Sequence, residues 1–68
     1  MKKIYIAHCI EHREKFIFIF KTSETKPEKL LSMAQDEAEG WGAECYDVTL
    51  AGAEYKDRED IWDADVED

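Results

Sequence analysis

The side chains best suited to bind a metal ion stand close together in the stretch HCIEH. His8, Cys9 and His12, with the distant Cys45, supply the two cysteines and two histidines of a possible zinc site. Neighbouring residues in a strand point to opposite faces, so His8 and Cys9 would not both reach one ion unless the strand broke there. We therefore expect no metal and no cofactor, with His8 partly buried in a strand and His12 in a solvated turn.

The last twelve residues, DREDIWDADVED, hold seven acids and one arginine. They lack the regular aspartates, the glycine and the closing glutamate of an EF-hand calcium loop. Such a run is usually a solvating end of the chain, yet Ile61 and Trp62 are apolar and serve no purpose in that role. Two interpretations stay open: a solvating tail, or an ordered segment whose carboxylates imitate nucleic-acid phosphates and fit a groove lined with Arg and Lys.

The chain shows no pattern of an enzyme. A nucleophilic Cys9 or Cys45 would need a base within hydrogen-bond reach and an oxyanion site, and neither is indicated. The glycine-rich loops that bind phosphates and the G-x-S-x-G elbow are absent from the 68 residues. A chain of this length buries only about 60% of the surface exposed by its unfolded form, which leaves little room for a substrate pocket.

The net charge of −8 is concentrated toward the end of the chain. Residues 1–53 hold nine acids and seven bases, or −2, whereas residues 54–68 hold eight acids and two bases, or −6. Binding of phosphates or of anionic membranes needs clustered Lys and Arg, so a basic protein surface is the expected partner. No run of eighteen apolar residues is present and no signal peptide is evident, so we expect a cytoplasmic protein with free thiols at Cys9 and Cys45.

The pattern of apolar residues predicts an α+β fold. KIYIAHCI and KFIFIFK alternate as two strands of a hairpin around EHRE. Residues 26–39 then have helical periodicity, with Thr25 and Glu28 spaced as a capping box, Pro27 in the first turn, and glycines as the stop.

The apolar stripe of this helix is expected to be core: Leu30, Leu31, Ala34, Ala38 and Trp41. AECYDVTLAG returns to alternation as a third strand, with Tyr46, Val48 and Leu50 on one face and Cys45, Asp47 and Thr49 on the other. A right-handed crossover would place it beside the first strand and antiparallel to it.

The expected architecture is thus a small ββαβ domain over residues 1–53, an antiparallel sheet with one helix packed on one face. Residues 54–68 form an acidic segment that belongs to the same domain as a fourth strand or a short helix.

Both faces of the hairpin are apolar, but one helix covers only one of them. With a His12-Arg13 loop, Cys9 pairs with Phe16, Ala7 with Phe18 and Tyr5 with Phe20 on one face, and Ile6 with Ile19 and His8 with Ile17 on the other. The second face needs a cover. Three remain open: the closing segment with Trp62, a second copy of the chain, or another protein.

The chain resembles the small acidic inhibitor proteins that bacteriophages and mobile elements encode. Among these are anti-CRISPR proteins, antirestriction proteins and inhibitors of host RNA polymerase. The resemblance lies in the length, the ββαβ pattern, the passage TKPEKLLSMAQDEAEGWGAECYDVTL and the acidic end DREDIWDADVED. It implies a non-enzymatic inhibitor in the cytoplasm of a bacterial host, which blocks a nucleic-acid-processing complex by binding it.

On that hypothesis the partner-binding residues are the closing acids with one aromatic anchor: Asp57, Glu59, Asp60, Trp62, Asp63, Asp65 and Glu67. An alternative interface uses the sheet face, with Tyr5, Phe16, Phe18 and Phe20 as anchors and the acids steering association. The rival hypothesis is an accessory protein that homodimerises through this apolar face.

Overall fold

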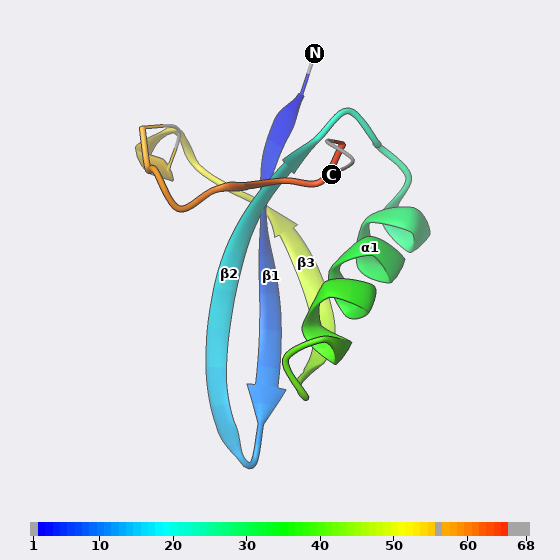
Figure 1. Ribbon diagram of the computed structural model, residues 1–68. Coiled ribbons are helices and arrows are strands. Elements are labelled where there is room, and N and C mark those ends of the chain that lie inside the picture. The colour runs from blue at the N-terminus through cyan, green and yellow to red at the C-terminus, as the bar shows by residue number, and fades with distance from the viewer. Residues whose placement is uncertain (1, 56, 66–68) are drawn as a thin grey trace.

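The structure is a computed structural model that describes residues 2–55 and 57–65. Its elements are β1 (Lys3–Glu11), β2 (Glu14–Thr22), α1 (Pro27–Glu39), β3 (Glu44–Leu50), the short 3-10 helix η1 (Ala53–Tyr55) and β4 (Trp62–Asp63). The strands form one sheet in the order β3-β1-β2-β4, and α1 lies against one of its faces (Figure 1). The expected α+β class and ββαβ order are confirmed.

β1 and β2 form the hairpin in the register that a His12-Arg13 loop requires. Cys9 pairs with Phe16, and the pairing runs on to Tyr5 opposite Phe20, as expected. His12 and Arg13 have φ angles of 49° and 72°, the left-handed values that both central residues of a type I′ turn adopt. Neither residue is the glycine or asparagine that this turn prefers. The register therefore comes from the burial of alternate side chains on the strands.

The start of α1 differs from the expected capping box. Lys26 is the N-cap residue, and its side chain makes no capping hydrogen bond. The Glu24 carboxylate instead accepts the backbone N–H groups of Thr25 and Lys26, at 3.1 and 3.2 Å. These hydrogen bonds, above all the one from Lys26, lower the pKa of Glu24. The predicted capping box of Thr25 and Glu28 is wrong, because the N-cap is Lys26 and the N–H of Thr25 that Glu28 would accept is bonded to Glu24 instead.

The end of α1 follows the expected glycine stop. Gly42 takes a left-handed φ of 77°, and the N–H of Ala43 reaches back to the carbonyl of Ala38 at 3.0 Å. The middle of the expected stripe, Ala34 with Ala38, is fully buried, but Trp41 at its end is 48% exposed.

β3 lies beside β1 and antiparallel to it, as expected. The predicted alternation along this strand is wrong, because a bulge shifts the pairing with β1 and reverses the facing of the residues before it. Val48 and Cys45 therefore both pack toward the core below α1. Tyr46 points to the opposite face, where its ring centroid lies 6.4 Å from that of His8.

The closing segment returns to the sheet as β4, which pairs with β2 in parallel, with Trp62 opposite Phe20. The sheet is therefore mixed, and the expectation of a purely antiparallel sheet is wrong. The reason is topological: β3 and β4 occupy opposite edges, so the chain crosses the sheet and then runs in the direction of β2 (Figure 1).

The two faces of the sheet are covered differently. The core lies between α1 and the face that carries Tyr5 and Phe20. On the other face, Ile19 is only 3% exposed, whereas Ile17 is 46% exposed. The connection from β3 to β4 leads from one edge of the sheet to the other, at the end where β3 finishes (Figure 1). The chain itself thus covers one end of the second face and leaves the other open.

Candidate protein-binding surfaces

Three of the acids expected to meet a partner are engaged within the chain. Asp63 forms an ion pair with Lys2, with 2.8 Å between Oδ2 and Nζ. Asp60 accepts two hydrogen bonds from the guanidinium of Arg58, at 2.9 and 2.6 Å. Asp65 makes the most contacts of the three.

Asp65 fastens the closing segment to the end of β2. Its carboxylate accepts the Thr22 hydroxyl at 2.6 Å, and the backbone N–H and hydroxyl of Ser23 at 2.8 and 2.9 Å. The bond from Thr22 is the largest reason that the pKa of Asp65 lies below its usual value. Hydrogen bonds from Lys2 and from Arg58 have the same effect on the pKa of Asp63 and of Asp60. Asp63 and Asp65 thus fasten the segment to Lys2 and to the end of β2, whereas Asp60 bonds to Arg58 of the segment itself.

Trp62 anchors the same segment. Its ring centroid lies 6.1 Å from that of Phe20 and 6.4 Å from that of Phe18, and its side chain is partly buried. Phe18 also meets Trp41 edge-on, at 4.9 Å and 77°. Trp62 thus completes the aromatic cover over β2 on the helix side.

Asp57 and Glu59 are exposed in the connection before β4. Glu67 lies outside the described residues. Residues 62–65 pair with or hydrogen-bond to the sheet, so the interpretation as a purely solvating tail is wrong for them.

The alternative anchors on the sheet face are largely unavailable to a partner. Tyr5 and Phe20 are buried in the core, at 7% and 0% exposure. Phe16 and Phe18 are partly buried and pack against that core. This interface is contradicted for Tyr5 and Phe20, because α1 and Trp62 cover the face on which they lie.

The apolar sheet surface that remains open is the opposite one. Ile17 and Tyr46 are 46% and 52% exposed there, and His8 donates to or accepts from the Thr49 hydroxyl at 2.8 Å. Cys9, the neighbour of His8, faces the core, so the two cannot share an ion. Across residues 2–55 and 57–65, no three metal-binding side chains come together.

The two cysteines are free thiols, as expected. Cys9 and Cys45 lie opposite each other in β1 and β3, and both are buried. Burial, followed by the neighbouring thiol of Cys45, raises the pKa of Cys9 to about 12. Cys9 is therefore a protonated, unreactive core residue near neutral pH.

α1 and β3, which pack against each other, carry acids that the sequence reasoning did not single out. α1 and β3 together carry six acids against one base, Lys29, which amounts to −5. The acids are Glu28, Asp36, Glu37, Glu39, Glu44 and Asp47. The sequence reasoning placed β3 beside β1, as the structure does, but did not consider the acids of α1 and β3 together.

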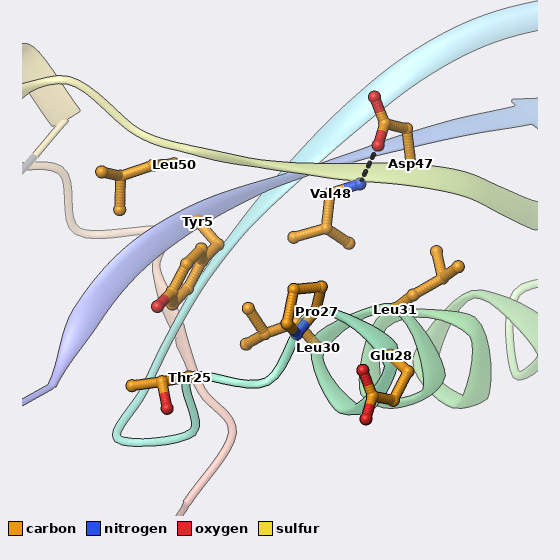
Figure 2. Close-up of a pocket in the computed structure, with 9 residues that line it drawn as sticks. All are labelled: Tyr5, Thr25, Pro27, Glu28, Leu30, Leu31, Asp47, Val48 and Leu50. Carbon is orange, nitrogen blue, oxygen red and sulfur yellow. Dashed lines mark hydrogen bonds between the residues drawn. The ribbon is translucent and has the colours of Figure 1, made fainter.

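Two hollows follow the seam between α1 and β3. The larger, about 560 Å³, is lined chiefly by apolar side chains near the start of the helix, with an acid from each element (Figure 2). Its residues are Tyr5, Thr25, Pro27, Glu28, Leu30, Leu31, Asp47, Val48 and Leu50. The smaller, about 220 Å³, lies farther along and includes Glu39 and Glu44. The larger hollow is thus an apolar cleft near the start of α1, and the smaller one is more polar.

Searches against protein families, characterised proteins and solved structures find no match to this chain. In the parts of the chain that the structure describes, no helix has the length and apolar character needed to cross a membrane.

Proposed function

We propose that this protein is a non-enzymatic binding protein that occupies a basic surface of a partner protein. The observation that carries the proposal is the set of six acids on α1 and β3, opposed within those elements only by Lys29. A partner surface rich in Arg and Lys complements it, and charge complementarity raises the rate and the specificity of association.

The backbone that carries these six acids is fixed to the rest of the sheet. β3 is hydrogen-bonded to β1, and α1 is held to the sheet by the buried side chains of Leu30, Ala34 and Ala38. Because the backbone that carries these acids is already ordered, a partner does not have to order it on binding.

We infer further that the basic partner surface is one built for nucleic acid, and that the protein inhibits a bacterial nucleic-acid-processing complex as anti-CRISPR proteins do. Support comes from the resemblance to small acidic phage inhibitors and from the chemistry of carboxylates, which accept the same charge-assisted hydrogen bonds as phosphates. Two of the C-terminal acids named from the sequence have a different main role here, since Asp63 and Asp65 hold the segment in place.

The test uses the immobilised protein, a bacterial lysate at low and moderate salt, and mass spectrometry of what is retained. The double variant Glu44→Gln/Asp47→Asn should lose most of the retained complex. The matched double variant Asp57→Asn/Glu59→Gln removes the same charge from the connection and should retain most of it. Added double-stranded DNA or transfer RNA should elute the complex by competition.

Two results would contradict the proposal. One is equal retention by the wild type and the variant with neutralised β3. The other is a retained complex that nucleic acid does not displace, since the contact then lies away from a nucleic-acid site.

A second candidate function is homodimerisation through the open sheet face. The exposure of Ile17 and Tyr46, next to the partly buried Ile10, favours it. Sedimentation equilibrium of the wild type and of Ile17→Lys decides this point. A dimer that dissociates in the variant supports the accessory protein, and a monomer at high micromolar concentration removes it.

A further inference from the structure

We propose that the cleft between α1 and β3 receives an extended, basic segment of a partner protein, which adds to the free edge of β3 as a further strand. This inference rests on the proposed function, because it names the part of the basic partner that is recognised. Three features of the cleft support it: its apolar lining, the backbone of the edge strand, and the placement of its acids.

The lining suits aliphatic side chains. Pro27 and Leu31 of α1 face Val48 across the cleft, with Leu50 at its end (Figure 2). Leu50 is 64% exposed, the largest exposed fraction among the big apolar side chains. Alternate side chains of an extended segment point the same way, so every second residue of such a segment can enter the cleft.

The backbone of β3 presents hydrogen-bonding groups on the outer side. The N–H of Ala51 bonds to the carbonyl of Ile4 at 2.9 Å, and Leu50 pairs with Tyr5. By the alternation of an antiparallel ladder, the N–H and C=O groups of Leu50 and Val48 then point away from β1. Among the described residues, no strand lies on that side of β3. A strand that lies there gains main-chain hydrogen bonds.

Polar side chains along the edge of β3 determine which kind of strand can pair with it. The Asp47 carboxylate accepts the outward N–H of Val48 at 2.9 Å (Figure 2), and the side-chain amide of Gln35 donates to the carbonyl of Cys45 at 3.2 Å. These side chains protect the edge from indiscriminate pairing. A Lys or Arg placed beside Asp47 draws the carboxylate away and frees the N–H of Val48 for a partner carbonyl. The edge therefore favours a basic strand over a neutral or acidic one.

The probe is a blocked peptide of alternating lysine and valine with seven residues, the length of β3. Titrated into ¹⁵N-labelled protein at low salt, it should shift the amide signals of Val48 and Leu50 and slow the hydrogen exchange of the Leu50 N–H. A peptide with glutamate in place of lysine should not bind. A peptide with N-methylated valines keeps the charge but cannot donate these hydrogen bonds, so it should bind more weakly.

Two variants locate the contact. Leu50→Ser should weaken binding by about tenfold, since an apolar contact of leucine size is lost. Ile17→Ser makes a comparable change on the opposite face and should leave the affinity within about twofold.

The inference is overturned if the peptide does not bind, because the acids then only protect the edge. It is also overturned if N-methylation and Leu50→Ser leave binding unchanged, because the attraction is then charge alone. In either case, capture of a complex that nucleic acid displaces would still uphold the proposed function. A peptide that binds at β3, with no such complex captured, would contradict the proposed function instead.

Discussion

Replacement of Trp62 by alanine should release the closing segment from the sheet and remove a large part of the stability of the domain. The ring of Trp62 contacts Phe20 and Phe18, with centroids 6.1 and 6.4 Å away. Truncation of a fully buried tryptophan costs about 3–5 kcal/mol, and the partial exposure of this one reduces the loss to about 2–3 kcal/mol. A chain of 68 residues has a free energy of unfolding of about 3–10 kcal/mol.

Thermal unfolding followed by circular dichroism measures this loss, and we expect the midpoint to fall by roughly 10–20 °C. Hydrogen exchange at Ala64, whose N–H bonds to the carbonyl of Lys21 at 3.0 Å, should become fast because β4 detaches. Trp41→Ala is the matched control. That side chain is 48% exposed, so the expected loss is about 1 kcal/mol. If Trp62→Ala is no more destabilising than Trp41→Ala, the anchoring role of Trp62 is refuted.

Three further predictions concern other contacts. His12→Asn combined with Arg13→Gly should raise the free energy of unfolding by about 1 kcal/mol, because both positions have left-handed φ; denaturant unfolding that shows no gain would contradict this. Burial raises the pKa of Cys9 from 9.0 to about 12, so the folded state keeps the thiol proton at pH values where the unfolded chain loses it. The contribution of Cys9 to the free energy of unfolding is therefore complete below pH 9.0 and is lost as pH rises toward about 12. Cys9→Ala should reduce that loss in unfolding curves measured at successive pH values. The pKa of Asp65 is lowered, so its contribution to the free energy of unfolding is present above the usual value of 3.8 and is lost as pH falls through the depressed value. Asp65→Asn should lower the midpoint of thermal unfolding at neutral pH and weaken the loss of stability in acid, while Asp57→Asn should do neither.

Much of the fold could be predicted from the sequence, because it depends on local periodicity. The alternation of KIYIAHCI and KFIFIFK predicted the hairpin and the opposite facing of its phenylalanines and isoleucines, while the prediction of the register depended on the His12-Arg13 loop that the structure shows. Helical spacing of Leu30, Ala34 and Ala38 determined the helix and its buried side. The crossover rule then placed β3 beside β1.

The candidate binding site could be predicted only in kind. An acidic surface was expected, but the acids of the closing segment were chosen for it because they are adjacent in the sequence. Adjacency does not show which carboxylates are already engaged. Asp65 is bound to Thr22, 43 residues away, and Asp63 to Lys2, 61 residues away.

By itself the sequence determined the class of the fold, the presence of the hairpin and the sign of the charge, since these follow from residue type and local spacing. Only the tertiary structure decided that β4 runs parallel to β2, that a bulge turns Tyr46 outward, and that β3 forms an acidic edge beside α1. Each of these depends on contacts between segments far apart in the chain. Such contacts are selected by the packing of the whole domain, and no local pattern encodes them.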